Sequence, residues 1–232
     1  IFYNNYKKNW SQSDYLKYSS LFNSYLNIFP EDKLYSLFYG TNKKRKIGFL
    51  SGDIYNHHSI IFFLKSVLKN YDKKKYEVHL YLSNKIENQD TENLKKLVDF
   101  SINISEINDL DAINLIRKNN LDIMIDLMGI TSINNRIALF KNRLAKTQIS
   151  WLGYCNTTGL KEMDYLIADP NLIYPEEKIF YSEKVIYLPE IWNTHSGFDL
   201  ERYHYPLPQT MNKYVTFGSF NNFNKINDDV IK

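Results

Sequence analysis

The sequence predicts an α/β protein with a Rossmann-like parallel sheet, preceded by a helical segment. The main observation is a regular alternation of short apolar runs with stretches in which apolar residues recur every three or four positions. The chain has 232 residues, enough for a well-buried core, and its composition of 44% hydrophobic and 24% charged residues is ordinary for a globular protein. Strands and helices that alternate at this spacing form right-handed βαβ units, which build a parallel sheet covered on both faces.

A helical segment is expected over residues 13–38. Aromatic and aliphatic residues recur there at three- and four-residue steps, as one face of a helix requires. The residues of this face are Tyr15, Tyr18, Leu21, Phe22, Tyr25, Leu26 and Phe29. Pro30 interrupts the helix, and the two acidic residues after it suit the first turn of a second short helix over 34–38. Residues 1–43 are therefore predicted to be a helical connector rather than a domain.

Four strand–helix units follow this connector. Strands are predicted at 47–51, 76–82, 101–104 and 121–127, and the helices after them at 58–70, 91–99, 110–119 and 133–141. Three shorter strands are predicted at 147–152, 164–168 and 184–188, with prolines in the loops between them. All of these elements fall within 44–208, the predicted Rossmann-like unit.

A second unit is predicted to begin near the end of the chain. Pro206 and Pro208 lie in a loop-rich stretch before an apolar run at 214–220, which reads as a new strand. Residues 209–232 are accordingly expected to be the first strand and helix of a second half. Because the chain starts at Ile1 and stops inside that expected helix, we expect it to be a piece of a longer protein, inactive by itself.

Charge and cysteine content exclude few classes of function. The net charge is 29 − 26 = +3, smaller than a dedicated nucleic-acid binder carries. A nucleic-acid hypothesis rests on the basic run at 43–46, which is more typical of a solvated linker before a strand. The single cysteine forms no internal disulfide, which indicates a cytoplasmic location. The longest uncharged apolar run, 59–64, is too short to cross a bilayer.

The loop after the first strand carries the first candidate site residues, because ligands of an open parallel sheet bind beyond the carboxyl ends of its strands. This loop, 51–58, lacks the G-x-G-x-x-G pattern, which disfavours a nicotinamide or flavin cofactor. His57 and His58 lie where a helix begins, a place that favours a neutral ring able to accept a proton, as a general base must. The alternative is that one or both histidines only cap or pack on the helix end.

Two further patterns suggest polar chemistry. Asp109 and Asp111 match the D-x-D pair with which metal-dependent nucleotide-sugar enzymes hold a divalent cation, but they open a predicted helix, where a cap and a first-turn acid explain them. No other cluster has metal-ligand spacing, so no metal is expected. Asn156, Thr157 and Thr158 follow a strand directly and face the expected crevice, where they could bind sugar hydroxyls or phosphate oxygens. A simple polar turn is the alternative.

Six motifs then occur in one order over residues 45–232. They are Gly48-Phe49-Leu50-Ser51 with Asp53, Asn56 and His57; Asp126-Leu127-x-Gly129-x-Thr131 with Arg136; Trp151-Leu152-Gly153-Tyr154 with Thr157-Thr158-Gly159; Met163-Asp164-Tyr165 with Asp169-Pro170; Tyr181-Ser182-Glu183-Lys184 with Leu188-Pro189; and Phe220-Asn221-Asn222-x-x-Lys225-Ile226. In this order they resemble the catalytic region of protein O-GlcNAc transferases, the glycosyltransferase family related to the plant SPINDLY proteins.

The resemblance implies a two-domain GT-B fold, of which this chain would hold the N-terminal half. It implies inverting transfer of N-acetylglucosamine from UDP-GlcNAc to Ser or Thr hydroxyls of acceptor proteins, with no metal or other cofactor. Helical TPR repeats precede the catalytic region in this family, so residues 1–43 would be a remnant of such an array. Protein acceptors and a sugar nucleotide are the implied partners, with no nucleic acid and no membrane.

The resemblance also assigns candidate site residues. His57 matches the active-site histidine of the family, and Lys225 matches the lysine that contacts the donor diphosphate. Asn222 falls where the family often has glutamine, beside the donor. Thr157 falls in a turn near the reacting groups. The remaining candidates for the acceptor side of the crevice are Asp53, Asp126, Thr131, Asn156 and Thr158.

Several positions depart from the family pattern, among them Leu144 and Lys146, which stand where the family's R-P-A-P motif has proline. Ile130 stands where the family has histidine or tyrosine, and Cys155 and Asn156 replace a Pro-Gly pair. These changes remove a polar ring and a rigid turn, and they favour the alternative of a non-catalytic protein-binding module or pseudoenzyme with half of a GT-B-like fold.

Overall fold

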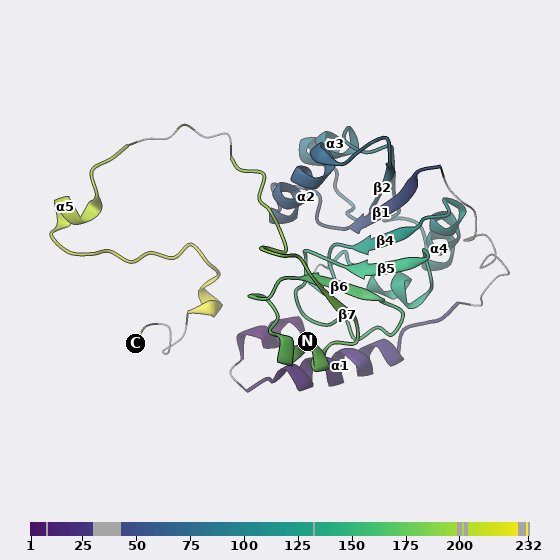
Figure 1. The fold of residues 1–232 in the computed structure, drawn as a ribbon, viewed down its shortest axis with the longest axis horizontal. Helices are drawn as coiled ribbons and strands as arrows, with labels where there is room; N and C mark the ends of the chain where they lie inside the picture. Colours follow the sequence, from purple (N-terminus) through teal and green to yellow (C-terminus); the bar gives the residue numbers. More distant parts are fainter. Residues whose placement is uncertain are drawn as a thin grey trace.

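A seven-stranded parallel sheet forms the body of the protein (Figure 1). The computed structural model describes residues 1–7, 9–29, 43–131, 133–198, 201, 204–226 and 231. The strands are β1 Arg45–Ser51, β2 Tyr76–Leu82, β3 Phe100–Asn103, β4 Ile123–Asp126, β5 Thr147–Ser150, β6 Tyr165–Ala168 and β7 Lys184–Tyr187. Their order across the sheet is β3-β2-β1-β4-β5-β6-β7, and every neighbouring pair is parallel. The sheet is therefore Rossmann-like, as predicted.

Helices cover both faces of this sheet. The α-helices are α1 Gln12–Ser24, α2 Ser59–Asn70, α3 Gln89–Lys95, α4 Asp109–Lys118 and α5 Pro208–Asn212, and the short 3-10 helices are η1 Phe2–Tyr6, η3 Ile137–Lys141, η4 Pro175–Phe180 and η5 Phe223–Lys225. On one face, Phe49 of β1 packs in a buried cluster with residues of α2 and α3. On the other face, its neighbour Leu50 packs with residues of α4 and η3. Successive strand residues point to opposite faces, so each strand contributes to two cores.

The predicted elements of the sheet and its crossovers are confirmed, with small shifts at their ends. All seven predicted strands between 47 and 188 are present, and β2 has the predicted bounds. The helix expected at 133–141 is only the short 3-10 helix η3, and α3 starts two residues before its predicted start because Asn88 caps it. The second short helix expected at 34–38 lies outside the described residues.

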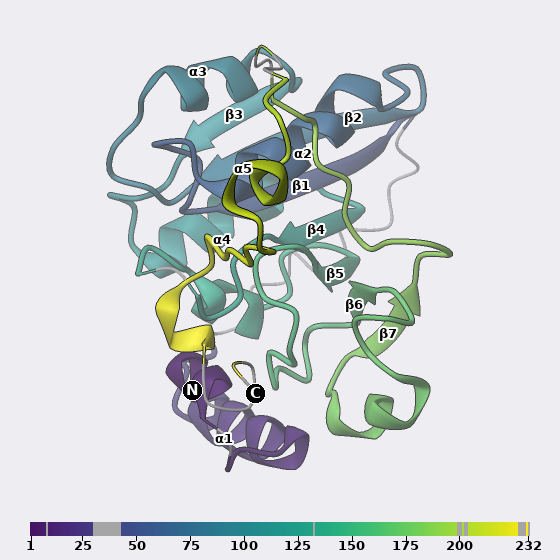
Figure 2. The same ribbon diagram turned by 90° about the vertical axis from the view of Figure 1, so that its left-hand side faces the viewer.

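The strand predicted at 214–220 is absent, and this prediction is wrong. Those residues form no strand, and the side chains of the stretch 204–225 are all exposed, including Phe217 at 93%. A β-strand needs a neighbour to pair its backbone N–H and C=O groups. No strand of the described part of the chain lies against 214–220, and the segment runs out from the carboxyl-end side of the sheet (Figures 1 and 2). The division of the chain at 208–209 stays a prediction.

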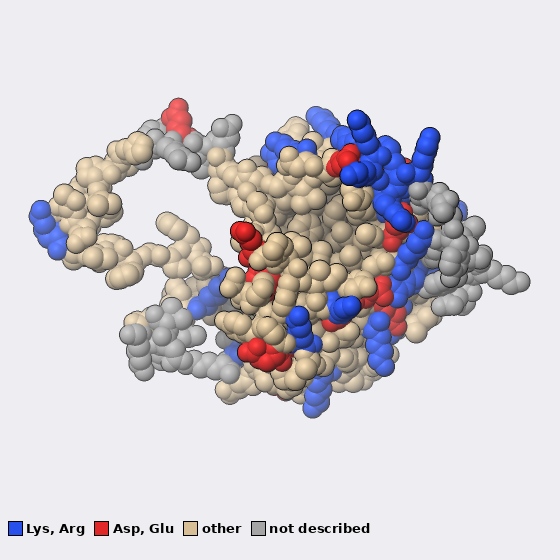
Figure 3. Space-filling model, in the orientation of Figure 1, with Lys and Arg blue, Asp and Glu red and all other residues tan. Residues whose placement is uncertain are grey.

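The basic run at 43–46 lies at the amino end of the sheet, away from the carboxyl ends of the strands. Arg45 and Lys46 begin β1, where they pair with Asp122 and Glu77 at 3.3 Å each. Figure 3 shows lysine and arginine side chains gathered over the starts of β1 and β2. Among the described residues, no helix is both long and apolar enough to cross a membrane.

Candidate active site at the carboxyl end of the sheet

The order of the strands changes direction between β1 and β4, so the carboxyl ends of these two strands mark the expected crevice. These two strands are neighbours, although β2 and β3 lie between them in the sequence. From β1 the chain continues outward through β2 to β3, and from β4 it continues outward in the other direction to β7. The loops after β1 and β4 therefore leave the sheet toward opposite sides, which is where a Rossmann-like sheet binds its ligands.

Asp126, the last residue of β4, is a buried carboxyl at this crevice. Its Oδ1 accepts the N–H of Met128 at 3.1 Å and its Oδ2 accepts the N–H of Gly129 at 2.8 Å. Burial raises the pKa of Asp126 to about 6; these two N–H groups act against the rise, and the negative charges of Asp53 and Glu183 add to it. The carboxylates of Asp53 and Glu183 are therefore close enough to repel that of Asp126.

The turn after β4 needs glycine at position 129. Gly129 has a φ of +56°, and a Cβ there would lie 2.6 Å from Cβ of Tyr154. Two residues on, the Thr131 hydroxyl donates to the carbonyl of Met128 at 2.7 Å and so closes the same turn. Between them, Ile130 packs against the buried cluster on the α4 face. The Gly129-x-Thr131 motif therefore shapes the turn that Asp126 holds.

The loop after β1 is in contact with this turn. The N–H of Gly52 points at the sulfur of Met128, and a Cβ at Gly52 would lie 2.7 Å from Cβ of Asn134. Asp53, next in the loop, is only 8% exposed, and its N–H donates to the Ser51 hydroxyl at 3.1 Å. The predicted site residues Asp53, after β1, and Asp126, at the end of β4, are therefore close enough for their charges to interact, although 126 − 53 = 73 positions separate them in sequence.

The polar residues after β5 point inward instead of into the crevice. Thr157 and Thr158 are fully buried, and both bind the carboxylate of Glu183. The Thr157 hydroxyl donates to Oε2 at 2.8 Å, the Thr158 N–H donates to Oε1 at 2.7 Å, and the Thr158 hydroxyl donates to the same Oε1. The expectation that these hydroxyls face the crevice is therefore wrong, because a buried carboxylate at the start of β7 takes them as its hydrogen-bond donors. A part for these residues in substrate binding stays a prediction.

Sequence reasoning did not single out Glu183 as a site residue. The only signal for it was the motif 181–184, which gives no hint of a partner 25 residues away. Asn156 also acts locally, because its side-chain oxygen accepts the N–H of Thr157 at 2.8 Å.

Helix α1 packs against this same loop. Asn23 is buried and donates to the carbonyl of Thr158 at 2.7 Å. Gly159 has a φ of +73°, and a Cβ there would lie 2.6 Å from the backbone and side chain of Ser19. The N-terminal segment is therefore fixed directly onto the loop that carries three of the candidate residues.

The two adjacent histidines have different surroundings. His58 is the N-cap of α2, and its ring nitrogen Nδ1 accepts the N–H of Ile60 at 3.4 Å. His57 has a side chain that is 83% exposed, and its Nδ1 lies 3.1 Å from Oδ2 of Asp90. The capping interpretation thus describes His58, whereas the His57 ring is accessible to a ligand.

Lys225 and Asn222 lie in the exposed C-terminal segment. Asn222 accepts the N–H of Asn224 at 3.0 Å, and Lys225 Nζ donates to Asn221 at 3.2 Å. Lys225 is also near the loop after β5: desolvation raises the pKa of the Cys155 thiol there, and the charge of Lys225 acts against this rise. The roles of Lys225 and Asn222 beside the donor stay predictions.

The D-x-D pair lies in the first turn of α4, as the alternative interpretation predicts. Asp109 accepts from Nε of Arg136 at 2.9 Å and from its Nη2 at 2.5 Å, and Asn108 caps the helix that Asp109 opens. Arg136 also donates to the carbonyls of residues 104 and 107, so it ties the turn after β4 to the start of α4. Within the described residues, no three His, Cys, Asp or Glu side chains are grouped as a metal would require.

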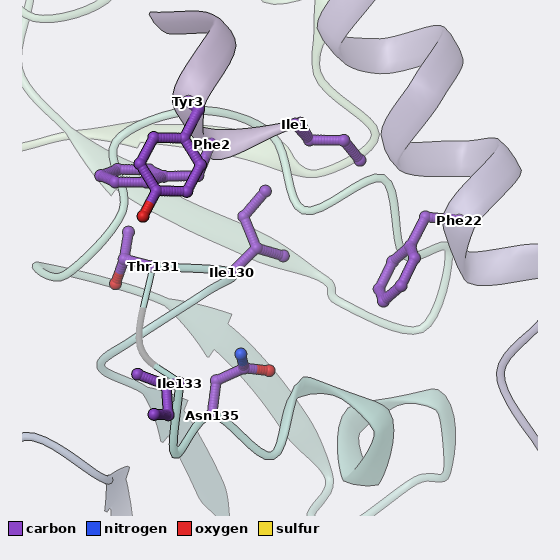
Figure 4. Close-up of a pocket in the computed structure, with 8 residues that line it drawn as sticks. All are labelled: Ile1, Phe2, Tyr3, Phe22, Ile130, Thr131, Ile133 and Asn135. Carbon is purple, nitrogen blue, oxygen red and sulfur yellow. The ribbon is translucent and has the colours of Figure 1, made fainter.

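An apolar pocket of about 420 Å³ lies beside the turn after β4 (Figure 4). The N-terminal residues Ile1 and Phe2 and the α1 residue Phe22 form one wall, and Ile130 and Thr131 form the other. This pocket lies where α1 and the preceding residues meet the candidate site.

Comparison with known proteins identifies the chain's relatives. The model of glycosyl transferase family 41 matches residues 30–205. The probable UDP-N-acetylglucosamine–peptide N-acetylglucosaminyltransferase SPINDLY of Solanum lycopersicum is 33% identical over 190 residues, which is 80% of this chain and 20% of that protein. SPINDLY of Arabidopsis thaliana is 31% identical over 80% of this chain and 21% of its own length. The chain thus spans about a fifth of the curated relatives it matches.

A solved structure supports the fold. A mutant of the Thermobaculum terrenum O-GlcNAc transferase aligns with a TM-score of 0.73 and 24% identity, covering 82% of this chain and 36% of that one. This match concerns the architecture of the sheet and its helices. Because the family model covers most of the chain, including every strand of the sheet, the chain belongs to glycosyl transferase family 41.

Proposed function

We propose that this chain is the N-terminal half of the catalytic unit in an inverting protein O-GlcNAc transferase with a two-domain GT-B fold. The observation that carries the proposal is the change in direction of the strand order between β1 and β4 in a chain of glycosyl transferase family 41. The donor is UDP-GlcNAc, and the acceptor is a Ser or Thr hydroxyl of a cytoplasmic protein. The proposal includes no metal or other cofactor, and it treats the N-terminal helical residues as the end of a TPR array.

In this reaction the acceptor oxygen attacks the anomeric carbon of the sugar from the face opposite the diphosphate. The bond from that carbon to the diphosphate oxygen breaks, UDP leaves, and the configuration at the carbon inverts. The leaving diphosphate gains negative charge, which a nearby cation stabilises more in the transition state than in the ground state. Lys225 is the proposed cation, and Asn222 the proposed neighbour of the donor.

The acceptor hydroxyl must also lose its proton. Asp126 does not fit this task, because both of its oxygens already accept N–H groups of the turn and its side chain is 1% exposed. His57 fits better, since its ring is accessible and it lies on the loop that follows the carboxyl end of β1. We assign His57 as the group that accepts the proton. Asp126 instead holds the turn after β4 in place.

The test is a comparison of the two histidines in the whole protein that contains this chain. His57→Ala should lower transfer from UDP-GlcNAc to an acceptor protein by roughly 10²–10⁴-fold, the usual range for a positioned proton-transfer group. The control is His58→Asn, which keeps an N-cap acceptor and should leave both stability and turnover nearly intact. Equal losses in the two variants, or no transfer by the wild-type protein, would refute the assignment.

A non-catalytic protein-binding module is the second candidate. It is favoured by the isoleucine at position 130, which lines an apolar pocket where the family has a polar ring. This alternative predicts that the whole protein binds a protein partner while showing neither transfer nor affinity for UDP. Calorimetric titration of the whole protein with UDP distinguishes the two functions, because only the transferase should bind UDP.

A further inference from the structure

The loop that carries His57 is held by the residues that open α3. Thr91 donates from its hydroxyl to the carbonyl of Ile54 at 2.6 Å, an interaction that is buried. Asn88 donates from its side-chain amide to Oδ1 of Asn56 at 3.0 Å. These contacts join two segments more than 30 residues apart, so the position of His57 depends on α3 as well as on its own strand and helix.

The backbone at this loop adopts an unusual conformation. Asn56 has a φ of +50° and His57 a φ of +54°, so two successive residues with side chains lie in the left-handed region. Such residues persist only where surrounding contacts hold them, and they gather at functional sites. The bonds from α3 are those contacts.

Asp90 is the residue that binds His57 itself. Its Oδ2 accepts the backbone N–H of His57 at 2.8 Å and lies 3.1 Å from Nδ1 of the imidazole ring. The Asp90 side chain is only 18% exposed, so protein surrounds this end of the pair while the rest of the ring faces solvent. One carboxylate oxygen thus fixes both the backbone and the ring of His57.

The chemistry of this contact decides where the imidazole carries its proton. A carboxylate oxygen 3.1 Å from Nδ1 attracts an N–H and repels a lone pair, so this contact favours a neutral ring with its hydrogen on Nδ1. The other nitrogen, Nε2, then holds a lone pair and faces away from Asp90. We propose that Asp90 is a positioning residue that fixes His57 in the Nδ1–H form and leaves Nε2 free to accept the acceptor's proton. The catalytic part of this inference rests on the proposed function.

A purely structural role for Asp90 does not account for the contact. The cap of α3 is formed by Asn88 and Thr91, which bond each other's backbone N–H groups. Glu92, another acidic residue of the same first turn, pairs instead with Lys95 of its own helix at 3.0 Å. Asp90→Ala and Glu92→Ala therefore remove the same charge from the same helix end, but only the first removes a contact with His57.

The experiment is ¹⁵N NMR of the histidine rings in this chain, at a pH where the rings are neutral. His57→Gln identifies the His57 signals among the five histidines. The wild-type ring should show a protonated Nδ1 and an unprotonated Nε2. Asp90→Ala should return His57 to the Nε2–H form that free histidine prefers, Asp90→Glu should restore the wild-type pattern in part, and Glu92→Ala should not alter it. A wild-type His57 with its proton on Nε2, or an unchanged pattern in Asp90→Ala, overturns the inference.

Kinetics of the whole protein separate this inference from the proposed function. Asp90→Ala should lower kcat by about 10–100-fold, the effect typical of a residue that orients a reacting histidine, with little change in KM for UDP-GlcNAc. If the wild-type protein shows the Asp90-dependent tautomer but no transfer, the proposed function fails and the positioning by Asp90 stands. Transfer that is unchanged in Asp90→Ala overturns the catalytic part of the inference.

Discussion

Replacing Glu183 by alanine should destabilise the chain strongly, because it removes the acceptor for three buried donors. The carboxylate is 4% exposed and takes hydrogen bonds from the Thr157 hydroxyl and from the N–H and hydroxyl of Thr158. A buried donor left without a partner costs roughly 1–3 kcal/mol. Two of the three donors are hydroxyls that can rotate toward other acceptors, and the substitution also relieves repulsion with Asp126. The net loss should therefore be about 3 kcal/mol, a large part of a typical stability.

Urea unfolding of this chain, followed by circular dichroism, measures the effect. With a slope of roughly 3 kcal/mol per molar urea, the midpoint of Glu183→Ala should fall by about 1 M at an unchanged slope. Glu183→Gln keeps the size and one acceptor oxygen, so it should lose less than half as much. Glu190→Ala removes an exposed acid from the loop after β7 and should stay within about 0.5 kcal/mol of the wild type. A Glu183→Ala midpoint as close to the wild type as that of Glu190→Ala would refute the reasoning.

Three further changes test other parts of the site. The pKa of Asp126 is raised to about 6, so the folded state keeps a proton that the unfolded state releases near pH 4. The free energy of unfolding should therefore fall by on the order of 3 kcal/mol as the pH rises from about 4 to 6. Asp126→Asn should abolish this pH dependence when unfolding is measured across that range. Gly129→Ala adds backbone strain at φ +56° and a clash with Tyr154, so it should lower the melting temperature by roughly 5–15 °C. The control is Gly197→Ala, which has a φ of +81° but nothing within 4 Å of the added Cβ, and it should lower the melting temperature far less. In the whole protein, Lys225→Ala should reduce transfer by about 10²-fold or more and Lys225→Arg should restore it only in part; wild-type rates in the alanine variant would contradict its proposed role.

The elements of the sheet could be predicted from the sequence because their signals are local. The alternation of apolar runs and amphipathic stretches is a property of neighbouring residues, and it located all seven strands and the helices between the first four of them. The parallel topology implied only that the site lies beyond the carboxyl ends of the strands, since ligands of open sheets bind there. Asp53 and Asp126 were candidates because their motifs resemble those of the family, and the structure brings their charges close enough to interact.

The tertiary structure alone decided which groups pair with which. The Thr157 and Thr158 hydroxyls could have faced the crevice, but they bind a glutamate that β7 brings beside the loop after β5. Composition does not distinguish the two adjacent histidines, whereas α3 places Asp90 against only one of them, His57. The run at 214–220 has the composition of a strand but no strand beside it to complete its hydrogen bonds. Local sequence patterns determine which segments form helices and strands. Hydrogen bonds between residues distant in the chain form only when these elements pack together, because no local pattern encodes which distant groups will meet.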